Sequence, residues 1–228
     1  MRAVTAAAAD AALRWREPAV RAVSRLAPAD VLWYVDTDAP AFALTFDDGP
    51  SPETTPQLLE VLARHRARAT FFLVGDRVRA HEPIVATIAA QGHELANHLM
   101  RDERSVLVPR PQFRRDLAEV SALLAPYAEV RWFRPGSGWF TPGMLRCAAE
   151  QNLRAVLGTL VAGHHGAPGD ERIARDLLAG IRPGSIVVLH EGSTKRRGVV
   201  ETTDELLTAL ADRGLAAVTV SQLVALRR

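Results

Sequence analysis

Short apolar runs alternate with longer helical patterns along most of the chain, and this alternation is the feature that most limits its possible folds. Seven runs have the length and composition of buried strands, and the segments between them repeat apolar residues at helical spacing. The expected strands are 41–46, 69–74, 93–97, 130–133, 154–158, 185–190 and 216–219. The expected helices are 54–66, 80–91, 111–124, 141–152, 171–180 and 201–213. Strands that alternate with helices indicate βα units and a parallel sheet.

The number of expected strands and the chain length together predict one α/β domain. With 228 residues and 48% hydrophobic composition, the chain can bury a sizeable core as one unit. We expect a distorted (β/α) barrel of about seven strands over residues 39–228, preceded by an N-terminal helical extension over residues 1–38. A doubly wound open sheet is the alternative. In both architectures the loops after the strands meet at one mouth, so functional side chains are expected just past the strand ends.

Composition and charge exclude several functional classes. The net charge is +2, Lys195 is the only lysine, and no dense basic run with interleaved aromatics occurs, which argues against a nucleic-acid partner. Cys147 is the only cysteine, so neither an intrachain disulfide nor a cysteine-based zinc cluster can form. Asp10 and the charged residues after it interrupt the alanine-rich start and leave no apolar stretch for export or for a transmembrane segment. We therefore expect a cytoplasmic protein.

Two adjacent carboxylates, Asp47 and Asp48, follow an apolar run and precede Gly49. Like charges this close repel each other unless a cation or a proton offsets them. A surface turn is the simpler interpretation, since Asp and Gly are favoured turn residues. The functional interpretation is a metal site or a catalytic pair, and the remaining motifs favour it.

Three later strands also end in reactive side chains. His98 and Asp102 follow the third expected strand, and they would project from one face if they form a helical turn, which suits a pair of metal ligands. Arg134 can hold a carboxylate in its ionised form, and the glycine-rich turn at Ser137 can present backbone N–H donors to an oxyanion. His190 ends a strongly apolar strand and can protonate a leaving group near neutral pH.

This ordered set of motifs resembles the polysaccharide deacetylase family, the NodB-like carbohydrate esterases of family 4. The match extends from about residue 41 to about residue 220. It rests on four segments in the same order: Thr45-Phe46-Asp47-Asp48-Gly49, Gly92-His93-Glu94-Leu95-Ala96-Asn97-His98, Phe133-Arg134-Pro135 and Leu189-His190. The resemblance implies a distorted (β/α) barrel that removes acetyl groups from N-acetylated sugars with a bound divalent metal, usually zinc.

By matching positions, the resemblance also implies a role for each polar residue. Asp48 and His98 would bind the metal. Asp47 would be the general base, and Arg134 would orient it. His190 would be the general acid that protonates the departing amine.

The resemblance further implies two substrate contacts, and the aromatic residues beside the third motif suggest a third. Ser137 would offer its backbone N–H to the oxyanion, and Leu189 would line the acetyl pocket. Trp132 and Trp139 flank the third motif, and either ring could stack on a sugar, although at least one is expected in the core. Trp139 is taken as the substrate contact.

The chain departs from the family pattern in two places. Asp102 stands where family members usually carry a second histidine, and it would complete a ligand set with Asp48 and His98. The extra negative charge should make a bound water less acidic and could favour harder metals, so cobalt or manganese are alternatives to zinc. The fourth motif normally supplies an Asp and a Trp, and the segment around His164 and His165 shows neither.

These observations predict a metal-dependent hydrolase that removes N-acetyl groups from an amino sugar, an oligosaccharide or a polysaccharide of the chitin or peptidoglycan type. Its expected cofactor is one divalent metal ion. A deacetylase of a small acetylated metabolite is one alternative. A non-catalytic carbohydrate-binding barrel, which lost its chemistry at Asp102 and in the fourth motif, is the other.

Overall fold

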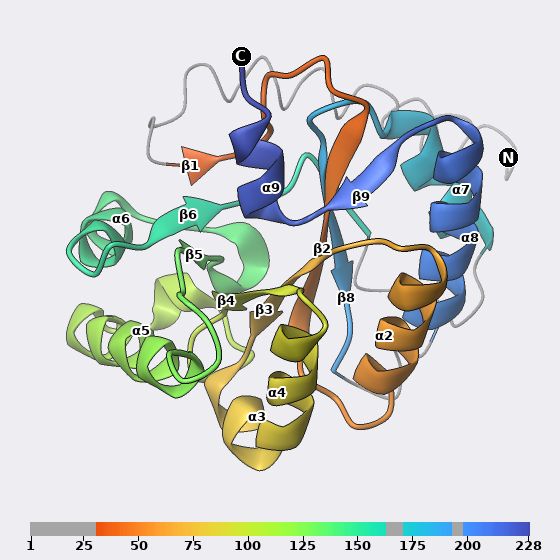
Figure 1. Cartoon of the computed structure of the whole chain (residues 1–228). Coiled ribbons are helices and arrows are strands. Elements are labelled where there is room, and N and C mark those ends of the chain that lie inside the picture. Colours follow the sequence, from red (N-terminus) through yellow and green to blue (C-terminus); the bar gives the residue numbers. More distant parts are fainter. Residues whose placement is uncertain (1–30, 163–170, 193–197) are drawn as a thin grey trace, which may run out of the picture.

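Parallel pairing joins all the described strands into one sheet (Figure 1). The computed structural model describes residues 31–162, 171–192 and 198–228. The strand order is β1-β6-β5-β4-β3-β2-β8-β7, with β9 paired to β2. The strands are β1 (Val31–Leu32), β2 (Ala41–Gly49), β3 (Thr70–Leu73), β4 (Glu94–Asn97), β5 (Trp132–Phe133), β6 (Arg154–Val156), β7 (Leu160–Val161), β8 (Ile186–His190) and β9 (Ala216–Val218).

The sheet curls into a half-barrel with helices arranged around its outer face (Figure 1). Strands β1 and β7 lie at the two ends of the strand order, and no pairing among the described strands joins them. The helices are α2 (Thr55–Arg64), α3 (Gly75–Ala80), α4 (Glu82–Ala90), α5 (Arg110–Leu124), α6 (Pro142–Ala149), α7 (Glu171–Gly180), α8 (Val199–Asp212) and α9 (Val220–Ala225). Helix α9 instead packs against the inner face, where Val220 and Leu223 join the inner cluster of apolar side chains.

The predicted distorted (β/α) barrel is therefore confirmed. Each of the seven expected strands and six expected helices overlaps an observed element. The elements that the sequence did not predict are short, since β1 and β7 have two residues each and α3 and α9 have six. Segments of this length hold too few residues for a periodic pattern to reveal them.

Residue alternation on β2 separates an outer core from the inner face. Phe42, Leu44 and Phe46 pack under the outer helices, whereas Ala41 and Ala43 belong to the inner cluster. Because successive side chains of a strand point to opposite faces, the next inward positions carry polar groups at the carboxyl end of β2. One of these polar groups, Asp47, lines a cavity at that end.

The sheet begins before the boundary that the sequence predicted between residues 38 and 39. Val31 and Leu32 pair with β6, so part of the expected extension belongs to the sheet. Residues 1–30, where the helical part of the extension was expected, lie outside the described residues. Within the described part of the chain, no helix combines the length and the apolar character needed to cross a bilayer.

His93 is a buried structural histidine. Its Nδ1 accepts a hydrogen bond from the Ala69 N–H at 3.3 Å, and its ring lies edge-on to Phe71 with centroids 5.6 Å apart. Burial, helped by the nearby Arg68, lowers the pKa of His93 to about 4. The folded protein therefore holds this imidazole in its neutral form near pH 7.

This burial predicts a loss of stability in mild acid. The unfolded chain takes up a proton on His93 below pH 6.5, whereas the folded chain does so only near pH 4, so unfolding becomes easier as the pH falls across this window. The lowered pKa of His93 can reduce the free energy of unfolding by at most about 3 kcal/mol as the pH falls. Urea unfolding of the wild type and of His93→Gln at pH 7.5, 5.5 and 4.5 measures it, because Gln can accept the bond but does not titrate. An equal loss in both proteins would contradict the assignment.

Candidate active site

The polar residues that end β2, β4, β5 and β8 line one cavity of about 480 Å³. Seven of the predicted site residues lie around this cavity, although they come from segments far apart in the sequence. They are Asp47, Asp48, His98, Asp102, Arg134, Ser137 and His190. The expectation that functional side chains gather past the strand ends is confirmed for this group.

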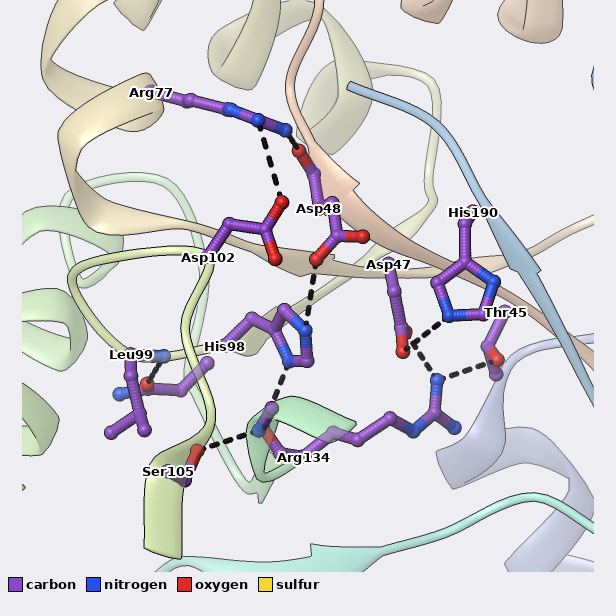
Figure 2. Close-up of polar contacts among 12 residues, drawn as sticks. Thr45, Asp47, Asp48, Arg77, His98, Leu99, Asp102, Ser105, Arg134 and His190 are labelled. Carbon is purple, nitrogen blue, oxygen red and sulfur yellow. Dashed lines mark hydrogen bonds and ion pairs between the residues drawn. The ribbon is translucent and has the colours of Figure 1, made fainter. Parts of the chain in front are cut away.

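Asp47 and Arg134 form a buried ion pair at the floor of the cavity (Figure 2). Arg134 Nη1 lies 2.5 Å from Asp47 Oδ1 and donates a second hydrogen bond to Thr45 Oγ1 at 2.9 Å. Its Nε donates to the Val156 carbonyl at 3.1 Å, and the guanidinium carbon lies 3.9 Å from the centre of the Phe72 ring. Four neighbours thus fix the guanidinium, which in turn fixes the orientation of the Asp47 carboxylate.

A break in β2 brings Asp48 to the same cavity as Asp47. In a regular strand two successive side chains point to opposite faces. Here the pairing with β3 shifts register between Asp47 and Gly49, and Asp48 has a φ of 68°, in the left-handed region. This conformation is uncommon for a residue other than glycine and turns the Asp48 side chain toward the cavity.

Gly49 and Glu191 pack closely beneath this break. A Cβ at Gly49 would lie 2.1 Å from Glu191 Oε1, so a larger residue there would require the Glu191 side chain to move. The hydroxyls of Thr54 and Thr55 donate to Glu191 Oε2 at 2.8 and 2.7 Å. Burial raises the pKa of Glu191 to about 7, with the threonine hydrogen bonds acting in the opposite direction. The backbone N–H of Glu191 also donates to the Asp47 carbonyl at 3.0 Å, which ties the ends of β8 and β2 together.

His98 faces the Asp48 carboxylate (Figure 2), with Nε2 and Oδ1 3.1 Å apart. Its Nδ1 lies 2.8 Å from the Arg134 carbonyl, which can only accept, so Nδ1 carries a proton. Burial alone would lower the pKa of His98, but the Asp47 and Asp48 carboxylates outweigh it and the pKa is raised. The lone pair of a neutral Nε2 would repel the carboxylate oxygen, so the pair needs a proton or a metal cation between its two acceptors.

These donors fit a divalent metal. A neutral imidazole with its other nitrogen bound to a carbonyl, beside a carboxylate, is a common ligand arrangement. Among the described residues, however, no group of three His, Cys, Asp or Glu side chains is already spaced to hold an ion. The full ligand set therefore stays a prediction.

Asp102 lines the cavity without the helical turn that the sequence analysis considered. The chain bends after His98, and Leu99 takes a φ of 63° while its N–H donates to Asn97 Oδ1 at 2.9 Å. The Asp102 carboxylate is about half exposed, and its Oδ2 lies 3.8 Å from Arg77 Nη2. Its predicted role as the third metal ligand is not decided by this geometry.

The turn after β5 presents Ser137 to the cavity. Gly136 N–H donates to Ser105 Oγ at 2.6 Å, and Gly138 N–H donates to the Pro135 carbonyl at 3.0 Å. Ser137 between them has a φ of 64°. These bonds hold the turn in one conformation.

The two tryptophans that flank this turn lie in different surroundings. Trp139 follows the turn and is 70% exposed, outside the set of cavity-lining residues. Trp132 is buried, and its indole N–H donates to Glu94 Oε1 at 3.0 Å. Trp132 therefore belongs to the core, as expected of one of the pair.

His190 and Leu189 lie on opposite faces of β8. His190 points into the cavity, and its Nε2 is 4.0 Å from Asp47 Oδ2. Leu189 is 1% exposed and packs in the outer core. Contrary to the prediction, it does not line the cavity. Val188 occupies the cavity wall instead, because residues two apart on a strand share a face. That alternation could have shown from sequence that the neighbour of His190 points away.

Two residues near the site were not predicted from the sequence. Trp33, just after β1, lines the cavity and packs edge-on against Phe140 with ring centroids 6.5 Å apart. Arg77, on α3, contacts Asp48 and Asp102. Neither belongs to a motif: Arg77 lies on a short helix and Trp33 follows a short strand, and the sequence pattern revealed neither element. His164 and His165 lie outside the described residues.

The buried ion pair predicts a large loss of stability when its cation is removed. Arg134→Met leaves Asp47 buried without its partner and should lower the free energy of unfolding by about 3 to 5 kcal/mol. Arg131→Met is the control, because Arg131 pairs with Glu129 at 2.6 Å where both side chains are more than half exposed. The control should lose less than about 1 kcal/mol. Urea unfolding at pH 7 gives both values, and a similar loss in the two variants would show that Arg134 is not a structural anchor.

Comparison with known proteins agrees with this geometry. The family model for polysaccharide deacetylase matches residues 34–156. A chitooligosaccharide deacetylase of Sinorhizobium fredii is 36% identical over 191 residues, which cover 78% of this chain and 89% of the relative.

Solved structures share the fold. A peptidoglycan N-acetylglucosamine deacetylase has a TM-score of 0.81 and 27% identity over 87% of this chain and 95% of its own. A family 4 acetyl xylan esterase from Clostridium thermocellum, in complex with a cobalt ion, has a TM-score of 0.73 and 30% identity over 82% and 91%. A pseudoenzyme of the same esterase family from Bacillus anthracis has a TM-score of 0.78 over 87% and 70%, but at 22% identity it shows the fold alone. The family match and the identity to the rhizobial relative establish that this chain belongs to the polysaccharide deacetylase family.

Proposed function

We propose that this protein is a metal-dependent hydrolase that removes N-acetyl groups from an amino-sugar oligosaccharide or polysaccharide. The observation that carries the proposal is the meeting of Asp47, Asp48, His98, Arg134 and His190 in one cavity. The named activities of the rhizobial relative and of the peptidoglycan deacetylase support an N-acetylated carbohydrate as substrate.

Asp48 and His98 would hold the metal, and Asp102 is proposed as the third ligand. Zinc is the proposed ion, with cobalt or manganese as alternatives, and the cobalt ion in the xylan esterase structure shows that a related fold accepts such a metal. A bound divalent ion polarises the amide carbonyl and makes a bound water more acidic.

Asp47 would act as the general base. Its Oδ1 is engaged by Arg134, and its Oδ2 faces the cavity on the side of His190. One oxygen therefore fixes the carboxylate while the other is directed to accept a proton from the attacking water. The Arg134 pair supplies this orientation before any substrate binds.

The other side of the cavity would handle the developing oxyanion and the leaving group. The fixed turn at Ser137 would present its backbone N–H to the oxyanion. His190 would donate a proton to the departing amine, which otherwise would leave as a high-energy amide anion. Val188, rather than Leu189, would contact the acetyl methyl group because it lies on the cavity side of β8.

The base assignment predicts that Asp47→Asn keeps the metal and loses turnover. Acetate release from N-acetylated chitooligosaccharides, with zinc restored to chelated protein, should fall at least about 100-fold because general-base catalysis is removed. Metal content should equal that of the wild type. Asp76→Asn is the control, since Asp76 is a half-exposed carboxylate that pairs with Arg101. Loss of zinc from Asp47→Asn would assign Asp47 to the metal instead.

The acid assignment predicts a dependence on the leaving group. His190→Ala should slow cleavage of an N-acetyl amide by about 100-fold or more, because the amine must be protonated as it leaves. Hydrolysis of an activated aryl acetate should change far less, because its phenolate leaves without a proton. Rates on both substrates with the same enzyme preparation measure the difference, and equal losses would remove His190 from the acid role.

One observation favours the second candidate, a carbohydrate-binding barrel without chemistry. The carboxylate of Asp102, the proposed third ligand, lies 3.8 Å from Arg77 Nη2, so an arginine can offset its charge without a metal. Metal content decides between the candidates. Stoichiometric zinc retained through gel filtration and acetate release support the hydrolase. Sugar binding without either supports the binding protein, and release from small acetylated compounds alone assigns a metabolite deacetylase.

A further inference from the structure

We infer that Arg77 is a positioning residue that holds Asp48 and Asp102 in place around the cavity. The inference rests on the proposed function, because both residues are proposed metal ligands. Arg77 does not itself line the cavity. It lies behind the wall that the two carboxylates form and acts through them.

A single guanidinium connects the carboxyl end of β2 with the loop that follows β4 (Figure 2). Arg77 Nη1 donates to the backbone carbonyl of Asp48, and Nη2 lies 3.8 Å from Asp102 Oδ2. The Arg77 side chain is only 28% exposed, although its helix lies at the surface. The planar fork of an arginine suits this double contact, whereas a lysine offers one point charge.

The contact supports Asp48 at the position where its backbone is least favourable. A non-glycine residue with a φ of 68° is strained, and it keeps this conformation only where its surroundings hold it. The conformation turns the Asp48 carbonyl outward to the guanidinium, which supplies a charged donor. Arg77 thus stabilises the break in β2 that brings the Asp48 carboxylate into the cavity.

Gly192 keeps space open for the same contact. A Cβ at this position would lie 1.8 Å from Arg77 Nη1 and 2.3 Å from the Asp48 carbonyl oxygen. Its φ of 88° also favours glycine. The loop after β8 is therefore shaped around the Arg77 side chain.

Helix α3 is itself bonded to the loop that carries Asp102. Gly75 N–H donates to the Leu99 carbonyl at 2.9 Å, and Asp76 N–H donates to the Met100 carbonyl at 3.0 Å. A Cβ at Gly75 would lie 2.4 Å from Met100 Sδ, so the helix start and the loop are in close contact. These bonds place Arg77 at a fixed position relative to both carboxylates, independently of the ion pair with Asp102.

The positive charge of Arg77 and its role in positioning the ligands should affect metal affinity in opposite directions. As a cation, Arg77 repels a divalent ion, so its removal by charge alone would strengthen binding. As a positioning residue, it holds ligands in place, so its removal should weaken binding. The sign of the change therefore identifies the role.

Zinc titration of chelated protein by calorimetry tests the inference. Arg77→Ala and Arg77→Lys should each weaken zinc binding by about 10-fold, the effect typical of groups that orient ligands. The lysine variant keeps the charge but cannot reach both partners, so it should not rescue. Arg79→Ala is the matched control, because Arg79 lies on the same helix and pairs with Glu119 at the surface. Its zinc affinity should equal that of the wild type.

Stronger binding in Arg77→Ala would show a purely electrostatic effect and overturn the inference. Unchanged binding in both variants would overturn it as well. Wild-type zinc affinity in Arg77→Lys would also overturn the inference, and this variant remains a test if Arg77→Ala does not fold.

Acetate release by the zinc-loaded wild type is measured separately. A wild type that binds zinc and releases no acetate contradicts the proposed function and leaves the affinity comparison valid, whereas a wild type without zinc affinity overturns both.

Discussion

The site depends on placing two consecutive carboxylates on the same side of one strand. A regular β2 would direct Asp47 inward and Asp48 into the outer core. The register shift before Gly49 and the left-handed φ of Asp48 remove this conflict. Several contacts meet at the break, including the Arg77 hydrogen bond to the Asp48 carbonyl and the close packing of Glu191 against Gly49. The local backbone is unfavourable by itself, and the surrounding contacts hold it.

Charge balance is the second requirement of this cavity. Asp47, Asp48 and Asp102 bring three carboxylates to the cavity, and within the described part of the chain two arginines contact them from opposite sides (Figure 2). Arg134 is buried and acts on the Asp47 side chain, whereas Arg77 is partly exposed and contacts the Asp48 backbone and Asp102. His98 Nε2 and the Asp48 carboxylate face each other without either arginine between them. A cation bound at this position would relieve the electrostatic repulsion between the two acceptors.

The two faces of the half-barrel differ in side-chain size. The outer face of β2 and β3 carries phenylalanine and leucine against the helices, which supplies the main hydrophobic stabilisation. The inner face carries alanines at 41, 43 and 96 and closes over Phe72 and Trp132. The alanines at the amino end of β2 share a cluster with Val220 and Leu223 of α9, whereas Asp47, an inward residue at its carboxyl end, lines the cavity. The cavity and the core are thus consequences of one alternating pattern.

The strand and helix order, the parallel sheet and most of the residues that meet at the mouth could be predicted from the sequence. Apolar runs and helical spacing are local patterns, and the carboxyl ends of parallel strands always converge, so Asp47, His98, Arg134 and His190 could be placed without a structure. Which side chains face the cavity depends on the three-dimensional arrangement of the chain. The break at Asp48, the bend after His98 and the inward position of Val188 in place of Leu189 depend on register and on loop conformation. The roles of Arg77 and Trp33 depend on short elements brought close by the curl of the sheet. Such choices arise from contacts between residues distant in sequence, and no local pattern records them.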